Sequence, residues 1–331
     1  MKVLFIGGTG NISSAVSKLA VSQGIDLYHL NRGLSKLYIP GVKTISGDIS
    51  NPASVFDELS RHHWDVVVNW VAFNENDIIR DIQLFKGRTK QYIFISSASV
   101  YQRPLTHPVV TESTPLCNPF WEYSRNKIAC EDKLTQAYRL EGFPMTIVRP
   151  SLTYNTVIPI AIGGFDEFTT ADRILKGKKI IVHGDGKSLW TVTSADDFAV
   201  GFLGLLGNIQ SIGHAFHITS DEILTWDQIH LILASALGKQ ANVVHIPSDL
   251  ICRFDNSYTG TLIGDKAESV IFDNSKIKMF VPGFRAVVPF SEGIKKTLAW
   301  FDANPGKKFI NPKTNETMDK IIDAYEKVFP E

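Results

Sequence analysis

Short apolar runs alternate with longer amphipathic segments over the first half of the chain. Short runs rich in Val, Ile, Leu and Phe predict buried strands, and apolar residues spaced three or four positions apart predict helices. Gly24, directly after the segment 11–23, fits the end of a helix. We expect strands at 3–6, 26–30, 43–46, 66–71, 92–96 and 146–148, and helices at 11–23, 52–61, 77–87 and 120–140.

The alternation breaks after Pro150. There the pattern predicts strands at 180–182 and 216–218, helices at 226–237, 292–302 and 316–328, and an irregular stretch at 245–290. Apolar strands that alternate with helices are typical of a parallel sheet covered on both faces. We therefore predict an α/β fold: a doubly wound parallel sheet over 1–155, with returning elements near 179–220, and a smaller mixed lobe over 156–331 that closes over a ligand.

Composition narrows the class of protein. The chain has 331 residues, of which 44% are hydrophobic and 21% charged, as in ordinary globular proteins. Its 34 basic and 34 acidic residues cancel, so bulk charge favours neither nucleic acid nor an anionic membrane. Three cysteines without a C-x-x-C pair indicate reduced thiols. The N-terminal apolar run is shorter than a signal sequence and no run could span a membrane, so we expect a cytoplasmic protein.

A glycine-rich turn follows the first predicted strand. Gly7 and Gly10 stand where a dinucleotide site needs a tight turn and close contact between backbone and pyrophosphate. The helix that follows would offer its free N–H groups to the phosphates. Ser13 occupies the third position of this pattern, which is normally glycine. A plain strand–turn–helix without a ligand would show a similar pattern.

Two further positions agree with a dinucleotide. Asn31 and Arg32 end the second predicted strand, where an acidic residue would hold the ribose of NAD and an arginine can meet the 2′-phosphate of NADP. Asp48, after the third strand, is placed to meet the adenine. A solvated arginine and a helix-capping aspartate remain the alternatives at these two positions.

The strongest chemical signal is Tyr123 followed by Lys127. Residues four apart share one face of a helix, and a nearby ammonium lowers the pKa of a phenol, so that it can act as a base. The pattern alone is common. Its context is informative, because the serines that begin at Ser96 end the fifth strand, at the carboxyl edge where such sheets bind ligands.

With these motifs the chain resembles the extended short-chain dehydrogenase/reductase family, in its NAD-dependent epimerase/dehydratase branch. The resemblance covers nearly the whole chain. The motifs that carry it are Gly7-x-x-Gly10, Gly47-Asp48, Asn69-Trp70-Val71-Ala72, Ser96-Ser97-Ala98-Ser99-Val100-Tyr101, Tyr123-x-x-x-Lys127, Arg149-Pro150-Ser151-Leu152-Thr153-Tyr154 and Gly184-Asp185-Gly186.

The resemblance implies a role for particular residues. Tyr123 would be the acid/base, Lys127 would hold the nicotinamide ribose and tune Tyr123, and Ser97 would hydrogen-bond the reacting oxygen. The implied cofactor-binding residues are Gly7, Gly10, Asn11, Ile12, Asn31, Arg32, Asp48, Ile49, Val71, Ala72 and Lys127. The implied substrate-binding residues are Ser99, Tyr154 and Trp190.

The chain also departs from the family pattern. The dehydratases carry Asp-Glu where this chain has Ala98-Ser99, so dehydration is not expected. Trp190 stands where nucleotide-sugar enzymes place an arginine for the diphosphate, and the second such position falls in the apolar stretch around Leu262. We therefore expect a substrate that is not held through a nucleoside diphosphate in the usual manner. If a diphosphate binds nevertheless, the cations that would replace the two missing arginines are Lys187, Lys266 or Arg285.

The sequence thus predicts an NAD(P)-dependent epimerase, leaning to NADP, that acts on a sugar or sugar-like alcohol, nucleotide sugars included, through a transient ketone. An NADPH-dependent carbonyl reductase of the same family is one alternative. An RNA-binding relative of the chloroplast stem-loop-binding type is another, since the segment 65–101 also resembles those proteins. The partner is a small molecule, a homodimer is compatible with this interpretation, and no metal is expected, because the histidine pairs at His62 and His214 do not converge.

Overall fold

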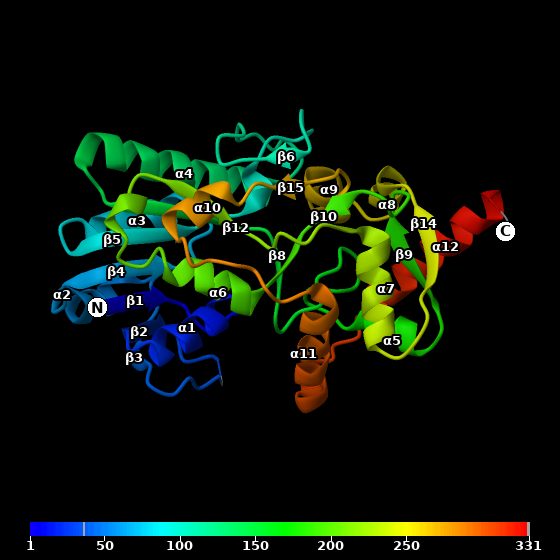
Figure 1. The fold of residues 1–331 in the computed structure, drawn as a ribbon, viewed down its shortest axis with the longest axis horizontal. Helices are drawn as coiled ribbons and strands as arrows, with labels where there is room; N and C mark the ends of the chain where they lie inside the picture. Colours follow the sequence, from blue (N-terminus) through cyan, green and yellow to red (C-terminus); the bar gives the residue numbers. More distant parts are fainter. Residues whose placement is uncertain (36, 330–331) are drawn as a thin grey trace.

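The computed structural model describes residues 1–35 and 37–329. A seven-stranded sheet lies in one half of the molecule, near the N-terminus (Figure 1), and all of its neighbouring strands are parallel. The strand order is β12-β7-β5-β4-β1-β2-β3. From β1 the sheet grows toward one edge through β2 and β3, and from β4 toward the other edge, so the topological switch point lies between β1 and β4. The strands are β1 (Lys2–Ile6), β2 (Asp26–Asn31), β3 (Lys43–Ser46), β4 (Trp64–Asn69), β5 (Thr89–Ile95), β7 (Met145–Pro150) and β12 (Ala215–Ile218).

Helices cover both faces of this sheet, as predicted. Successive residues of a strand point to opposite faces. Accordingly Val3 and Phe5 pack with the helices α1, α6 and α10, whereas Leu4 and Ile6 pack with α2, α3 and α4. The doubly wound α/β fold is confirmed. The covering helices are α1 (Ser13–Ser22), α2 (Phe56–Ser60), α3 (Glu75–Phe85), α4 (Glu122–Glu141), α6 (Ala195–Leu203) and α10 (Ser275–Phe280).

Local hydrogen bonds set the ends of the elements around the sheet edge. β4 ends at Asn69, two residues before the predicted end, because the Asn69 side chain accepts a hydrogen bond from the Val71 N–H (2.8 Å) and turns the chain away. Asn74 and Asp77 cap each other's backbone N–H groups at the start of α3. Gly142, in the left-handed conformation (φ +65°), ends α4.

The second lobe holds two further hydrophobic clusters. Its largest strand pair joins β9 to β14 in parallel. The stretch 245–290, expected to be irregular, contains several helices too short to show a periodic pattern. The elements of this lobe and its borders are β6 (Val109–Val110), β8 (Leu152–Tyr154), α5 (Thr169–Leu175), β9 (Lys179–His183), β10 (Leu189–Trp190), β11 (Val192–Ser194), β13 (Leu224–Thr225), α7 (Trp226–Ala236), β14 (Asn242–Ile246), α8 (Ser248–Phe254), α9 (Tyr258–Thr261), the π-helical turn Leu262–Lys266, β15 (Ile271–Phe272), α11 (Phe290–Ala303) and α12 (Pro312–Val328).

The chain returns from the second lobe to the sheet with α6 and β12. β9, within the stretch 179–220 where we expected returning elements, does not take part, because it pairs with β14 in the second lobe. α6 packs on α1, and α10 comes back later to pack beside β12 (Figure 1). The two lobes therefore interleave. None of the helices in the described residues is long and apolar enough to cross a bilayer.

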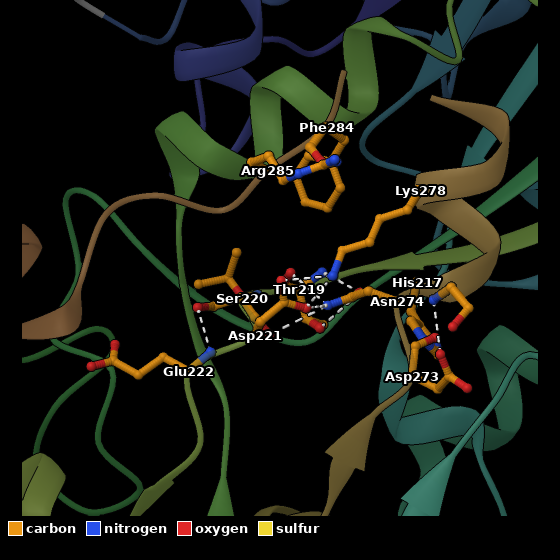
Figure 2. Close-up of polar contacts among 12 residues, drawn as sticks. His217, Thr219, Ser220, Asp221, Glu222, Asp273, Asn274, Lys278, Phe284 and Arg285 are labelled. Atoms are coloured by element: carbon orange, nitrogen blue, oxygen red, sulfur yellow. Dashed lines mark hydrogen bonds and ion pairs between the residues drawn. The ribbon is translucent and has the colours of Figure 1, made fainter. Parts of the chain in front are cut away.

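A polar cluster fixes this crossing point of the chain (Figure 2). The buried Asn274 side chain, just before α10, donates hydrogen bonds to the Thr219 carbonyl and to Asp221 (both 3.0 Å), and its oxygen accepts one from the Thr219 N–H (3.3 Å). Lys278 forms an exposed ion pair with Asp221 (2.8 Å). Asn274 thus replaces the hydrogen bonds that β12 loses where it ends.

Replacing Asn274 by Ala tests this role. The change leaves the N–H and the carbonyl of Thr219 without partners, and we expect the free energy of unfolding to fall by about 2–3 kcal/mol. Lys278→Ala, which breaks only the exposed ion pair, is the control and should cost less than about 1 kcal/mol. Urea unfolding of both variants measures the difference. Equal costs would contradict the account.

Candidate active site

The turn between β1 and α1 requires its glycines. Gly7 and Gly8 have φ angles of +94° and +113°, a region that residues with a Cβ rarely adopt. A Cβ on Gly8 would lie 2.5 Å from the Nε2 atom of His29. The Gly7 N–H donates a hydrogen bond to the Leu30 carbonyl (2.9 Å). The turn is therefore packed against β2, and its other side lines a cavity.

Two serine side chains of α1 form hydrogen bonds with residues in and beside this turn. Ser13, at the position where the pattern normally has glycine, accepts a hydrogen bond from the Gly10 N–H (2.8 Å). The Ser17 hydroxyl lies 2.9 Å from His29 Nε2. Burial lowers the pKa of His29 to about 4, so the ring is neutral at pH 7. Ser17 and His29 were not anticipated from the sequence, because their role follows only from packing.

The start of α1 has the features of an anion site. The backbone N–H groups of Asn11 and Ile12 find no acceptor within the described part of the chain. The Asn11 side chain donates to the Thr153 carbonyl (3.1 Å) and accepts from the Thr156 N–H (2.9 Å). Asn11 thus ties the turn to the segment that enters the second lobe, while its N–H stays free for a phosphate.

A cavity of about 460 Å³ continues from the glycine turn along the ends of β2 and β3. Its lining includes Asn31, Arg32, Asp48, Ile49 and Val71, all expected from the sequence. Hydrogen bonds from Ser50 lower the pKa of Asp48, with the positive charge of Arg32 nearby. An ionised carboxylate and an arginine therefore face this cavity.

Arg80 also lines the cavity and was not anticipated. Its guanidinium is held by Asp77 (2.8 Å) and by the fully buried Asp81 (2.9 Å). Its charge, like that of Arg32, lowers the pKa of Asp48. The residues present thus fit a dinucleotide: a glycine turn, free N–H groups at a helix start, and a cavity with two arginines.

Ser97, Tyr123 and Lys127 meet at the carboxyl end of β5. Ser97 and Tyr123 line a second cavity, of about 530 Å³, which Ile12 also lines, beside the glycine turn. Tyr123 and Lys127 lie one turn apart on α4. Lys127 is 2% exposed, and its ammonium donates to the carbonyls of Ala72 (2.6 Å) and Ile95 (2.8 Å). An ammonium carries three N–H donors, so one has no acceptor within the described residues, and Lys127 itself lines neither cavity.

The pKa of the Tyr123 phenol differs from our expectation. Burial raises it, although hydrogen bonding from Ser97 acts in the opposite direction, and the charge of Asp265 raises it further. Lys127 does not lower it as expected, because the ammonium faces two carbonyls and lies 5.7 Å from the centre of the Tyr123 ring. Burial lowers the pKa of Lys127 itself to about 8.

A row of serine hydroxyls supports Ser97. Ser99 Oγ lies 2.9 Å from Ser97 Oγ, and the buried Ser124 donates to Ser99 Oγ (2.8 Å). Asn118 donates to the Ser99 carbonyl (2.8 Å). Ser99 therefore lines the cavity and positions Ser97 as well. Ser124 and Asn118 were not identified from the sequence, since nothing in the local pattern shows which way they point.

Two predicted substrate-binding residues lie elsewhere. Tyr154 is 2% exposed and packs edge-on against Phe290, and Trp190 is 1% exposed and packs against Trp226. Both side chains point into the core of the second lobe and do not line the cavity. The expectation that they contact the substrate is therefore withdrawn.

Other residues take their place around the cavity. Trp121 and Tyr123 lie close together (ring centres 5.1 Å apart), and Asp265 and Lys266 approach from the π-helical turn Leu262–Lys266. Phe165, which has an unusual positive φ of +25°, separates this cavity from a groove beside the glycine turn. Asp166, exposed and next to it, lines both spaces.

No group of three or more metal-binding side chains lies together within the described residues. The histidines of the two pairs considered in the sequence have other contacts. His62 lies 2.7 Å from the Lys2 ammonium, and His217 contacts the Tyr101 hydroxyl (2.9 Å) and the Asp273 carbonyl (2.7 Å).

Comparison with known families agrees with this geometry. A family model described as the NAD dependent epimerase/dehydratase family matches residues 3–219, which include the glycine turn, Ser97, Tyr123 and Lys127. The chain belongs to this family. The resemblance inferred from the motifs is confirmed, and the protein is an enzyme of the oxidoreductase type that uses a nicotinamide cofactor.

Individual relatives are distant and differ in activity. The chain is 23% identical over 250 residues to a 2′-dehydrokanamycin reductase from Streptomyces kanamyceticus, covering 75% of this chain and 70% of that protein. It is 26% identical over 260 residues to the chloroplast stem-loop binding protein of 41 kDa b from Arabidopsis thaliana, covering 74% of this chain and 65% of that protein.

Among solved structures, a UDP-glucuronic acid 4-epimerase from Bacillus cereus, in complex with UDP-glucuronic acid and NAD, matches with a TM-score of 0.72 and 18% identity. The match covers 92% of this chain and all of that one (100%). At this identity the likeness shows the fold alone.

A matched pair of glycine substitutions tests the role of the turn. Gly8→Ala places a Cβ against His29 in a strained conformation, and we expect the nicotinamide cofactor, NAD or NADP, to bind at least about tenfold more weakly. Gly24→Ala has a comparable strain (φ +76°) but meets only open space, so it should leave cofactor affinity unchanged. Calorimetric titration with NAD and with NADP measures both. Wild-type affinity in Gly8→Ala would contradict the assignment.

Proposed function

We propose that the protein transfers a hydride between a nicotinamide cofactor and a secondary alcohol or ketone on a sugar or sugar-like molecule. Its specific reaction is epimerisation through a transient ketone. The observation that carries this proposal is that Ser97 and Tyr123 line one cavity beside the glycine turn, with Lys127 buried one helical turn after Tyr123.

Each residue has a separate task in this mechanism. Tyr123 acts as a phenolate that takes a proton from the substrate alcohol during oxidation, and the hydroxyl so formed returns a proton to the carbonyl oxygen during reduction. Ser97, held by Ser99, hydrogen-bonds the same oxygen. The third N–H of Lys127 binds a ribose hydroxyl and so places the cofactor beside Tyr123. The nicotinamide ring, when bound, supplies or accepts the hydride.

The shape of the cavity supports epimerisation. Ile95, Leu152 and Ile160 give the cavity apolar walls, which would leave a ketone few directional contacts there and let it turn over between hydride transfers. Dehydration is not proposed, because Ala98 and Ser99 offer no carboxyl group.

A carbonyl reductase is the second candidate, and the similarity to 2′-dehydrokanamycin reductase favours it. The two reactions differ in cofactor use. An epimerase turns over with a catalytic amount of cofactor, whereas a reductase consumes one NADPH for each product molecule. Following NADPH absorbance alongside product formation separates them.

We also propose that the cofactor is NADP. Arg32 and Arg80 line the cavity at the end of β2, and the residue that ends β2 is Asn31 rather than an acid. Arginine forks match phosphate oxygens, so the exposed Arg32 would bind a 2′-phosphate directly, while Arg80, already held by Asp77 and Asp81, adds its positive charge.

Calorimetry with both cofactors tests this preference. We expect NADP to bind more tightly than NAD, and Arg32→Ala to weaken NADP by about tenfold while changing NAD little. Arg61→Ala, an exposed arginine paired with Glu58 at the end of α2, is the control. If NAD binds about tenfold more tightly than NADP, the proposed preference is wrong.

Replacement of Tyr123 tests the mechanism. Tyr123→Phe removes the proton donor but keeps the ring, so turnover on the best substrate of a sugar panel should fall by about 10²–10⁴-fold with cofactor affinity almost unchanged. Tyr138→Phe, a half-exposed tyrosine on the same helix, should have no effect. Wild-type turnover in Tyr123→Phe would disprove the proposed mechanism.

An RNA-binding function is a different class of candidate, suggested by the similarity to the chloroplast stem-loop binding protein. Gel-shift measurements with a stem-loop RNA at increasing salt distinguish it, because phosphate-driven binding weakens steeply with salt. We expect no shift at physiological salt. Tight, salt-sensitive binding that persists in Tyr123→Phe would favour the RNA-binding function.

A further inference from the structure

The cavity that holds Ser97 and Tyr123 is poor in positive charge. Among its described lining residues the charged side chains are Asp166, Asp265 and Lys266, which is one ammonium against two carboxylates. A diphosphate brings about two negative charges, and burying it requires paired cations or several N–H donors. The charge of the cavity is thus opposite to what a nucleoside diphosphate needs.

The single ammonium is already engaged. Lys266 Nζ donates to Asp265 Oδ2 (2.7 Å), and it lies 6.0 Å and 5.8 Å from the ring centres of Trp121 and Trp190. The pair is largely buried, with Lys266 8% exposed and Asp265 9% exposed. A phosphate could use this ammonium only by displacing Asp265.

A second cation, the guanidinium of Arg103, contacts Asp265. Arg103, 3% exposed, approaches the other carboxylate oxygen of Asp265 (3.4 Å) and lies near Glu268 (3.8 Å). It does not line the cavity. Arg103 holds the carboxylate of Asp265 in place, and Asp265 in turn holds Lys266.

The other cations that we considered as substitutes lie elsewhere. Lys187 pairs with Asp227. The Arg285 guanidinium donates to the backbone carbonyls of Pro282 and Phe284, and Arg285 does not line the cavity. Lys18 and Lys307 line the groove on the other side of Phe165, next to the glycine turn.

The cavity lining formed by Asp265, Lys266 and Trp121 suits a sugar ring. A carboxylate that accepts and an ammonium that donates, fixed side by side, match the hydroxyl groups of a sugar, each of which both donates and accepts. Trp121 provides a flat apolar wall for the C–H face of the ring. Asp166 at the mouth adds an exposed negative charge that favours a neutral or amine-bearing ligand over an anion.

We propose that the substrate is a sugar or glycoside without a nucleoside diphosphate, whose hydroxyl groups are bound by the Asp265–Lys266 pair. This inference rests on the proposed function and specifies its substrate class. It would separate this chain from relatives named for nucleotide sugars.

The decisive comparison uses two ligands that share one sugar. UDP-glucose and methyl α-glucoside are titrated against the NADP-loaded protein, with binding followed by ligand-observed NMR. We expect the diphosphate to add no affinity, so that UDP-glucose binds no more tightly than the methyl glucoside. Tighter binding of UDP-glucose overturns the inference.

Charge variants keep the test decisive when both ligands bind weakly. Asp166→Asn, at an exposed position, should strengthen UDP-glucose binding several-fold, because it removes a repelling carboxylate. Asp265→Asn should weaken methyl α-glucoside binding several-fold, because it removes the charged acceptor of the pair. Asp302→Asn, outside the lining of the cavity, is the control. If thermal unfolding shows both cavity variants to be folded, but Asp166→Asn leaves UDP-glucose binding unchanged or Asp265→Asn leaves methyl α-glucoside binding unchanged, the inference fails.

Failure of the inference and failure of the proposed function give different results. If NADP binds and Tyr123→Phe is inactive, but nucleotide sugars are the best substrates, the inferred substrate class is wrong and the proposed function stands. If no nicotinamide cofactor binds, both the proposed function and the inferred substrate class are wrong.

Discussion

The buried ammonium of Lys127 joins the three elements that must meet for this site to exist. It donates to the carbonyl of Ala72 after β4 and to that of Ile95 at the end of β5, and its helix carries Tyr123 one turn earlier. Burying a charge is costly unless its hydrogen bonds are satisfied, so α4 has little freedom to slide over the sheet. The position of Tyr123 beside Ser97 follows from this constraint.

The glycine turn depends on a similar fit between small groups. Gly8 has room only for hydrogen because the neutral His29 ring lies against it. Ser13 replaces a glycine of the usual pattern and adds a hydrogen bond to the Gly10 N–H. The turn thereby stays close to β2, and the N–H groups of Asn11 and Ile12 have no acceptor within the described residues.

Much of the sheet and of its ligand edge could be predicted, because both depend on local pattern. β3 was predicted at its exact bounds, and the predicted cofactor residues Arg32, Asp48, Ile49 and Val71 share one cavity, since the carboxyl ends of parallel strands lie together. Tyr154 and Trp190 show the limit. Motif position could not reveal that both side chains point into the second core.

Asp265 and Lys266 could not be found from the sequence as a pair facing the site. They come from a π-helical turn within a stretch without regular pattern, far along the chain from Tyr123, and only tertiary packing brings them to the cavity. The pKa of Tyr123 was misjudged for a related reason. Spacing shows that Lys127 is near, but not that its ammonium is directed at two carbonyls.

The central claim is that the buried Lys127 and the Ser97–Tyr123 pair form one hydride-transfer site. A crystal structure of the protein grown with NADP tests it most directly. The account predicts the pyrophosphate at the N–H groups of Asn11 and Ile12, a ribose hydroxyl bonded to Lys127 Nζ, and the nicotinamide ring facing the cavity beside the Tyr123 hydroxyl. A nicotinamide that lies away from Tyr123, or a ribose without contact to Lys127, would contradict it.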